Sequence, residues 1–336
     1  MTTIVVDAMG GDHAPQVEVE GAVLAARDYG VAIQLVGPPP LLQRHLQRHN
    51  ADSLPISIVP ASEVITMDES PVKALRRKPE ASVRVAALQV RDAKAQGMVS
   101  AGNTGAAMAA AKMELGTLPG VDRPALASVF PTKRGTPAVL VDVGANVDCR
   151  PQHLQQFAIM GEVYYRVMFG VARPRVGLLS IGEEASKGNE VVRETHKRLK
   201  ETPLSFDFVG NVEGRDLYGG DVHVIVCDGF IGNVALKISE GMVEAIMAML
   251  KEAMSSNLTA QVGYVLSRQA YDEFKKRLDY SEYGGAPLLG IRGICVICHG
   301  RSNANAIKNA IRVAAGFSEA GINEKIEKEL ALAVAK

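Results

Sequence analysis

The sequence predicts an α/β protein with a doubly wound, three-layer α/β/α fold and a mostly parallel sheet. Short apolar runs of strand length recur along the chain, and patterns with helical spacing often lie between them. The runs are apolar in both registers, which is typical of strands that helices cover on both faces. The expected strands are Thr3 to Val6, Ala32 to Val36, Ile56 to Val59, Met98 to Ser100, Ala138 to Val141, Arg175 to Ser180, Val222 to Val226 and Ile294 to Cys298.

The composition is that of a folded protein with a large core. Of 336 residues, 47% are hydrophobic and 22% are charged. No proline- or serine-rich linker divides the chain, so we expect a single two-lobed α/β domain over residues 1–336, with a lobe boundary near residue 150. Lysine plus arginine equals aspartate plus glutamate, at 37 each, so no overall field attracts nucleic acid and no nucleic-acid partner is expected.

The N-terminal residues lack the basic region and apolar core of a secretory signal, and the longest apolar stretches fall short of the roughly 20 residues that cross a membrane. We therefore expect a cytoplasmic protein with reduced cysteines that act as small hydrophobic residues. Cys295, Cys298 and His299 match the C-x-x-C-H pattern of haem attachment, but the interleaved apolar residues indicate a buried strand instead. The other two cysteines are Cys149 and Cys227.

Glycine, asparagine and aspartate collect where the expected strands end. In doubly wound folds, ligands bind beyond the carboxyl ends of the strands. Two of the loops share the spacing V-x-x-G-x-x-G, from Val99 to Gly105 and from Val226 to Gly232, and each precedes a helical pattern. The six loops are Asp7 to Pro15, Ser100 to Ala106, Asp142 to Asn146, Ile181 to Gly188, Cys227 to Asn233 and His299 to Asn303.

The loop Ser100 to Ala106 has the composition of an anion site. A glycine-rich turn that leads into a helix exposes backbone N–H groups at the positive end of the helix dipole. Gly102 and Gly105 permit close approach, and the side chains of this loop add neutral donors. The alternative is that these glycines only form tight turns. Asparagine accompanies glycine in these segments more often than turn geometry alone requires. The asparagines are Asn103, Asn146, Asn211, Asn233 and Asn303.

Signatures of other chemistries are missing. The sequence has no P-loop, no G-x-G-x-x-G after the first strand, no H-E-x-x-H and no G-x-S-x-G. An open alternative is a magnesium site formed by acids that lie in separate loops. These acids are Asp7, Asp12, Asp142 and Asp228. Phosphate donors without a protein nucleophile suit phosphate itself as the attacking group. Lys187 and His299 are the loop residues best suited to anchor phosphate or to protonate a leaving group, with a surface lysine and a capping histidine as the alternative.

Nine motifs, in order along nearly the whole chain, closely resemble the phosphate acyltransferases of bacterial phospholipid synthesis, the PlsX family. They are DAMGGDHAP (Asp7 to Pro15), SAGNTGA (Ser100 to Ala106), RPA (Arg123 to Ala125), DVGANVDC (Asp142 to Cys149), IGEEASKG (Ile181 to Gly188), GNVEG (Gly210 to Gly214), CDGFIGN (Cys227 to Asn233), YGGAPLLG (Tyr283 to Gly290) and HGRSN (His299 to Asn303).

The resemblance implies a transferase that converts acyl-[acyl carrier protein] and inorganic phosphate to acyl phosphate and free carrier protein. The product would feed an acyl phosphate:glycerol-3-phosphate acyltransferase in phospholipid synthesis. The resemblance also implies a fold similar to the isocitrate dehydrogenase and phosphotransacetylase group, a homodimer, and no metal or organic cofactor. Cys295 and Cys298 are not part of the family pattern, which agrees with a packing role.

We predict the site as follows. Phosphate binds the loop Ser100 to Ala106 with Asn146, Asn233 and Lys187 nearby, and loop N–H groups or asparagine amides stabilise the oxyanion. The candidate catalytic residues are Lys187, His299, Asn233 and Asp228. The candidate residues for binding phosphate or substrate are Asp7, Gly10, Gly11, Ser100, Gly102, Asn103, Thr104, Gly105, Asn146 and Gly229.

The segment 238–278 is rich in methionine and strongly helical by propensity, and residues 253–267 carry no charge. We expect a protruding helical hairpin that contacts a second copy of the chain, a membrane surface, or both. Its apolar tip would insert into the inner face of the cell membrane through Leu258, Val262, Val265 and Leu266. The two basic clusters are Arg76 to Lys78 and Lys275 to Arg277. They would meet lipid headgroups or the acidic carrier protein, and the alternative is that each is a solvated face.

Two rival functions stay open at this point. A decarboxylating dehydrogenase of the same fold would need a nicotinamide cofactor and a metal held by aspartates. A non-catalytic membrane scaffold would bind vesicles and form no acyl phosphate.

Overall fold

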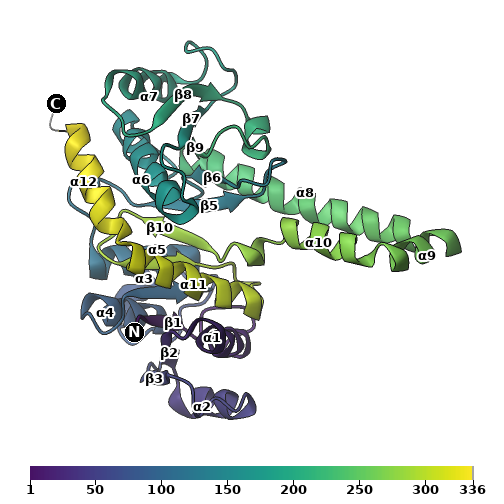
Figure 1. Cartoon of the computed structure of the whole chain (residues 1–336). Coiled ribbons are helices and arrows are strands. Elements are labelled where there is room, and N and C mark those ends of the chain that lie inside the picture. Colours follow the sequence, from purple (N-terminus) through teal and green to yellow (C-terminus); the bar gives the residue numbers. More distant parts are fainter. Residues whose placement is uncertain (335–336) are drawn as a thin grey trace.

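Eleven strands form one sheet with helices on both faces in the computed structural model, which describes residues 1–334 (Figure 1). Their spatial order is β3-β2-β1-β4-β11-β10-β5-β6-β9-β7-β8. The strands are β1 (Thr3–Asp7), β2 (Ala32–Gly37), β3 (Ile56–Pro60), β4 (Gly97–Ser100), β5 (Ala125–Phe130), β6 (Ala138–Val141), β7 (Arg175–Leu179), β8 (Asp207–Val212), β9 (Val224–Val226), β10 (Ala286–Leu289) and β11 (Ile294–Ile297).

The predicted fold class is confirmed, and each of the eight predicted strands is present. The strands β5, β8 and β10 were not predicted. The strand β8 is the most polar of the three, with aspartate, glycine and asparagine. The sequences of β5 and β10 are as apolar as that of the predicted strand β3.

The sheet consists of two parallel blocks. The first block is β3, β2, β1, β4 and β11, and the second is β6, β9, β7 and β8. Three successive antiparallel pairings join them, β11 with β10, β10 with β5 and β5 with β6. Because an odd number of reversals separates the blocks, their strands run in opposite directions, and their carboxyl ends lie at opposite edges of the sheet.

Helices cover both faces of the sheet. On one face α1 packs on α11, and α6 packs on α7 and α12; on the other, α4 and α3 pack on α5. Local sequence sets several helix boundaries: α2, α3 and α6 begin with proline, and α1, α6 and α11 end at a left-handed glycine. The helices are α1 (Gln16–Tyr29), α2 (Pro39–Arg48), α3 (Pro71–Arg77), α4 (Ser82–Arg91), α5 (Thr104–Leu115), α6 (Pro151–Phe169), α7 (Glu190–Glu201), α8 (Gly229–Ser255), α9 (Leu258–Leu266), α10 (Arg268–Leu278), α11 (Ala304–Ala320) and α12 (Ile322–Val334), with short 3-10 turns at η1 (Gly214–Tyr218) and η2 (Tyr280–Glu282).

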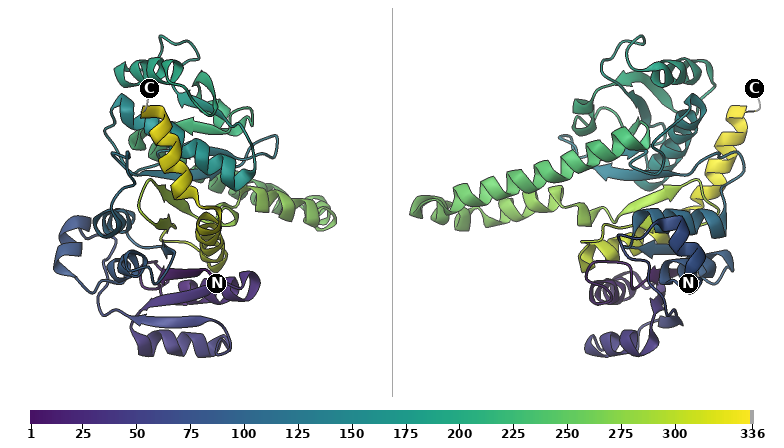
Figure 2. Two further views of the ribbon diagram at one scale, coloured as in Figure 1. Left: turned by 60° about the vertical axis from the view of Figure 1, so that its left-hand side comes forward. Right: turned by 180° about the vertical axis from the view of Figure 1, so that it is seen from behind.

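A helical arm made of α8, α9 and α10 projects away from the sheet in every view (Figures 1 and 2). This confirms the predicted hairpin, although α8 begins at Gly229 rather than near residue 238. The tip is strongly exposed: Leu258 is 78% and Leu266 is 83% accessible to solvent. Within residues 1–334, no helix combines the length and the apolar character needed to span a membrane.

Candidate active site

Three loops that the sequence predicted as ligand-binding lie side by side beyond β1, β4 and β11. In the sheet, Asp7 pairs with Ser100, and Ser100 pairs with Ile297, so these adjacent strands end at one level. The chain then enters α1 and α11 on one face but α5 on the other. Such a reversal of helix side marks the crevice where ligands bind in doubly wound sheets. We call the loops 7–15, 100–106 and 299–303 the first loop set.

The floor of the first loop set is closely packed and buried. The Ser100 hydroxyl donates to Asp7 Oδ2 at 2.7 Å, and neither residue is exposed by more than 1%. Burial raises the pKa of Asp7 above its usual value. A Cβ on Gly10 would lie 2.7 Å from the backbone nitrogen of Gly102, so this close approach requires glycine. Asp7, Gly10, Ser100 and Gly102 therefore hold the two loops together from below.

The start of α5 offers free backbone donors. Asn103 Oδ1 accepts from the Ala106 N–H at 3.1 Å and caps the helix. The N–H groups of Thr104 and Gly105 have no hydrogen-bond acceptor among residues 1–334. With the helix dipole, these N–H groups form a place for an anion.

The Asn103 amide nitrogen is already engaged. It lies within hydrogen-bond distance of the carbonyl oxygens of Thr66, Met67 and Glu69, at 3.2, 3.1 and 3.3 Å. The amide therefore ties the loop 100–106 to residues 66–69, and its contribution to an oxyanion stays a prediction.

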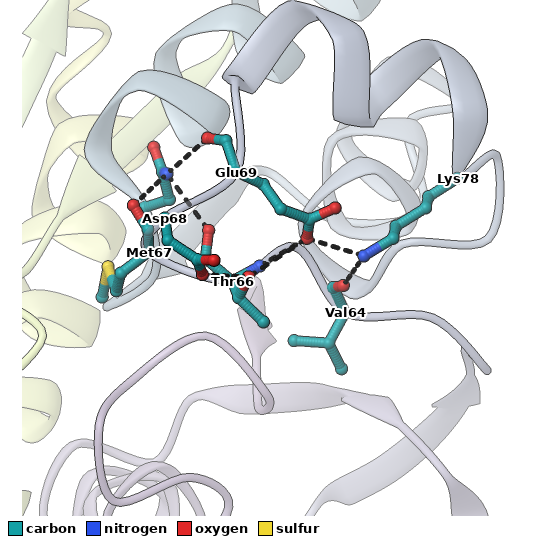
Figure 3. A network of polar contacts seen from close by, with 7 residues as sticks. Val64, Thr66, Met67, Asp68, Glu69 and Lys78 are labelled. Carbon is teal, nitrogen blue, oxygen red and sulfur yellow. Dashed lines mark hydrogen bonds and ion pairs between the residues drawn. The ribbon is translucent and has the colours of Figure 1, made fainter.

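The segment 66–69 was missed by sequence reasoning, because it contains neither glycine nor a recognisable motif. It is held by Glu69, whose carboxylate accepts from the Thr66 N–H at 2.9 Å and from Lys78 Nζ at 2.6 Å (Figure 3). Lys78 also donates to the Val64 carbonyl at 2.7 Å. Met67 is 48% exposed, and a Cβ on Gly300 would lie 2.7 Å from its Cε, so this segment also reaches the loop 299–303.

His299 is half-buried in the first loop set. Its Nδ1 accepts from the Arg301 N–H at 3.2 Å, which assigns the ring proton of the neutral form to Nε2. Burial, followed by the charge of Lys237, lowers the pKa of His299. At neutral pH the ring is therefore uncharged with Nε2–H as its donor. Lys237 of α8 also brings a cation toward these loops that the sequence did not single out.

A buried acid lies beneath the same loops. Glu18 in the first turn of α1 is 1% exposed, and its Oε2 has no hydrogen-bond partner among the described residues. A Cβ on Gly11 would lie 2.2 Å from Glu18 Oε1, so Gly11 leaves room for this carboxyl group. Burial, with a smaller contribution from Asp7, raises the pKa of Glu18 to about 7.

The loops of the second block form a separate group, the second loop set, at residues 142–146, 181–188 and 227–233. Asp142 is buried, and its oxygens accept from four backbone N–H groups, those of Leu126, Gly144, Ala145 and Asn146. The side-chain nitrogen of Asn146 donates to Asp142 and to the Pro124 carbonyl. The Gly229 N–H donates to the Asn146 carbonyl at 2.7 Å. These polar groups serve mainly to hold the loops to one another.

The predicted neighbours of the Ser100 loop do not lie beside it. Asn146 and Asn233 follow strands that end at the opposite edge of the sheet, and Lys187 is exposed in the loop after β7. Within residues 1–334, no hydrogen bond joins the first loop set to the second. Asp228 and Gly229 also belong to the second set, where the Asp228 carboxylate caps α8 by accepting from the Ile231 N–H at 2.8 Å.

Three of the four cysteines are buried, as the sequence predicts, and Cys149 is half-buried. Burial raises the pKa of Cys149, Cys295 and Cys298 to about 12 and that of Cys227 well above its usual value. Cys295 lies within β11, as expected for a buried strand. None of the four is a thiolate near neutral pH, so none is prepared to act as a nucleophile. Within residues 1–334, no group of three or more metal-binding side chains is assembled.

Known proteins resemble this chain over nearly its full length. The family model described as "Fatty acid synthesis protein" matches residues 2–325. A phosphate acyltransferase of Acidobacterium capsulatum is 55% identical over 332 residues, which are 98% of each chain. A phosphate acyltransferase of Koribacter versatilis is 60% identical over 340 residues, covering 99% of this chain and 94% of that one.

Solved structures resemble it in fold. A phosphotransacetylase from Streptococcus pyogenes has a TM-score of 0.63 at 17% identity, covering 95% of this chain and 94% of that one. A 4-hydroxythreonine-4-phosphate dehydrogenase from Klebsiella pneumoniae has a TM-score of 0.51 at 11% identity, covering 95% and 98%. At this identity the likeness shows the fold alone, so the architecture is shared by acyl-transferring enzymes and dehydrogenases.

Proposed function

The chain belongs to the fatty acid synthesis protein family and is a phosphate acyltransferase, and we propose that its substrates are acyl-[acyl carrier protein] and inorganic phosphate. The observation that carries this proposal is the start of α5, where two backbone N–H groups lack acceptors among the described residues and the capping side chain, Asn103, is neutral. A phosphate dianion there would face the helix dipole without an opposing charge on the cap.

In the proposed reaction, a phosphate oxygen attacks the thioester carbonyl. The carbon–oxygen bond forms, the carbon–sulfur bond breaks, and the carrier protein leaves as a thiolate that takes up a proton. The neutral His299 is proposed to donate a hydrogen bond from Nε2–H to the leaving sulfur, and the thiolate then takes its proton from water, with Lys237 offsetting negative charge nearby. The raised pKa values of the four cysteines support phosphate, rather than a protein thiolate, as the nucleophile.

Lys187, Asn233, Asp228 and Asn146 stay predictions of substrate contact from the second loop set. Lys187→Ala should lower turnover by roughly a hundredfold if the lysine stabilises the transition state, since one such donor is worth on the order of 3 kcal/mol. Near-normal turnover with long-chain acyl carrier protein would remove Lys187 from the mechanism.

The direct test of the proposed function is to incubate palmitoyl carrier protein with the enzyme and follow the release of the carrier thiol. Release should depend on phosphate and should match the acyl phosphate formed. Thiol release that is independent of phosphate would indicate a thioesterase instead, and no release with this donor would contradict the substrate assignment.

We also propose that the arm tip binds the inner face of the cell membrane, where the acyl phosphate:glycerol-3-phosphate acyltransferase would consume the product. Leu258, Val262, Val265 and Leu266 are between 55% and 83% exposed. Leu258→Glu with Val262→Glu should release the protein from anionic lipid vesicles and leave the activity in solution unchanged. Thr259→Glu with Gln261→Glu adds the same charge at polar positions of α9 and is the matched control. Equal sedimentation of the two variants with vesicles would contradict the membrane role.

A homodimer is the proposed assembly, with α8 as its contact. Four apolar side chains at helical spacing on α8 are between 42% and 67% exposed: Ile238, Met242, Ile246 and Met249. A stripe of this kind on a soluble helix favours a protein partner. Met242→Glu with Ile246→Glu should convert the dimer to a monomer in sedimentation experiments.

A further inference from the structure

The outer face of α3 is a compact basic surface. Lys73, Arg76 and Arg77 are exposed and lie at i, i+3 and i+4, so they share one side of the helix. Ala74 and Leu75 are buried on the opposite side. Val72, which is 46% exposed, adds an apolar position to the outer side. We call this surface the α3 basic face.

The three cations are available to a partner. Nearby basic residues are already paired: Lys78 with Glu69 at 2.6 Å, and Arg84 with Glu114 at 2.8 Å. Within residues 1–334, Lys73, Arg76 and Arg77 form no ion pair. A protein that docks here would therefore gain three charge contacts without displacing an existing acid.

The helix that carries the α3 basic face contacts the proposed phosphate loop at its first residue. A Cβ on Gly105 would lie 2.7 Å from the ring of Pro71, the first residue of α3. The residues that lead into α3 are tied to the same loop, because Asn103 donates to the carbonyls of Met67 and Glu69. A macromolecule bound to the outer side of α3 would thus lie one helix away from the free N–H groups of α5, on an element that directly contacts their loop.

We propose that the α3 basic face is the docking surface for the acidic carrier protein that presents the thioester to the phosphate loop. This inference rests on the proposed function and names its partner surface. It corrects the predicted basic cluster, since Lys78 is occupied by Glu69 while Lys73, which the sequence did not single out, belongs to the surface. Charge complementarity would speed the encounter and set the orientation of the carrier.

The test reverses the three charges with Lys73→Glu, Arg76→Glu and Arg77→Glu, and measures turnover in solution without vesicles. The KM for palmitoyl carrier protein should rise about tenfold or more, and its dependence on salt should weaken. Turnover with an S-acyl pantetheine, which has the thioester but no carrier protein, should stay unchanged. The matched control reverses three exposed cations that form no ion pair within residues 1–334, Lys197 and Lys200 on α7 and Lys328 on α12, and should leave turnover with both substrates unaffected.

The outcomes separate docking from the proposed function. An unchanged KM for palmitoyl carrier protein, or an equal loss with S-acyl pantetheine, would overturn docking at α3 while wild-type acyl phosphate formation stands. A wild-type enzyme that forms no acyl phosphate would overturn the function itself. Loss of vesicle binding with an unchanged KM would assign the surface to lipid headgroups. Should the triple variant fail to fold, Arg76→Gln with Arg77→Gln removes two charges and should give a smaller rise in the same KM.

Discussion

The two loops that share the spacing V-x-x-G-x-x-G have the same local structure but different chemistry. Both lead from a buried strand into a helix that a side chain caps, Asn103 for α5 and Asp228 for α8. At α5 the cap is neutral and the N–H groups of Thr104 and Gly105 are free among the described residues. At α8 the cap is an acid, and the Gly229 N–H already donates to Asn146. The spacing specifies the turn, while the cap charge and the free donors decide whether an anion can bind.

The glycines of the two loops also differ in what surrounds them. A Cβ on Gly232 would lie 1.8 Å from the Asp142 carbonyl oxygen, a backbone atom in the buried second loop set. A Cβ on Gly105 would meet side chains rather than backbone, the ring of Pro71 at 2.7 Å and Asn103 Oδ1 at 3.4 Å. The α8 loop is thus rigidly packed into the core of its block, and the α5 loop is open on one side.

The largest effect is therefore expected for Gly232→Ala. Its Cβ cannot be accommodated without moving the backbone of Asp142, so the free energy of unfolding should fall by about 3 kcal/mol or more. Urea denaturation measures this loss, with Gly105→Ala as the comparison that should cost less. Equal losses in the two variants would mean that the loops are packed alike.

A negative charge on the residue that caps α5, Asn103, should abolish phosphate binding. Asn103→Asp keeps the capping oxygen but puts a carboxylate at the start of α5 and removes the amide donor to the carbonyls of residues 66–69. Turnover should therefore fall roughly a hundredfold or more, equivalent to about 3 kcal/mol. The rise in melting temperature that phosphate gives the wild type should disappear in this variant and persist in Asp228→Asn.

The matched control for this substitution is Asn189→Asp, which changes the α7 cap, where Asn189 Oδ1 accepts from the Val192 N–H at 2.9 Å. It should retain both turnover and the phosphate-dependent rise in melting temperature. If phosphate still protects Asn103→Asp but no longer protects Asp228→Asn, the anion site belongs to α8.

Sequence predicted eight of the strands and the strand-to-helix turn at residues 100–106 because both depend on local patterns. Runs such as β6 and β9 are apolar throughout, and the glycine spacing after Val99 specifies a turn that leads into a helix. The reversal at β10 and β5 has no local signature, so the six loops were expected in one site rather than at two edges. Residues 66–69 were missed for a related reason, since their role comes from carbonyl oxygens that every residue possesses.

The buried acid Glu18, beneath the first loop set, should make the free energy of unfolding depend on pH, with an effect of intermediate size. The pKa of Glu18 is about 7 in the folded protein and near 4.5 in the unfolded chain. Its protonated form is favoured by folding, so the stability that it contributes is present below pH 4.5 and is lost as the pH rises to about 7. Between pH 5 and pH 8 the free energy of unfolding should fall by about 2 kcal/mol from this group.

Glu18→Gln keeps the shape of the protonated acid and should remove that fall, which urea denaturation at the two pH values would show. Glu20→Gln, on the same helix but half-exposed, should behave as the wild type. A wild-type stability that does not change between pH 5 and pH 8 relative to Glu18→Gln would mean that Glu18 is ionised in the folded protein. Such a buried charge would oppose phosphate in the loop above it.

The smallest expected change in stability comes from a glycine in the interior of α8, far from the loop that begins this helix. Gly241 is exposed in the interior of α8, and a Cβ there would meet nothing within 4 Å. Gly241→Ala should therefore stabilise the arm by about 1 kcal/mol through helix propensity alone, seen as roughly fivefold slower hydrogen exchange of the α8 amides. The dissociation constant of the proposed dimer should not change, since Gly241 lies outside the stripe of Ile238, Met242, Ile246 and Met249. A weakened dimer would instead place a partner backbone against Gly241, so that this position too needs glycine for close approach.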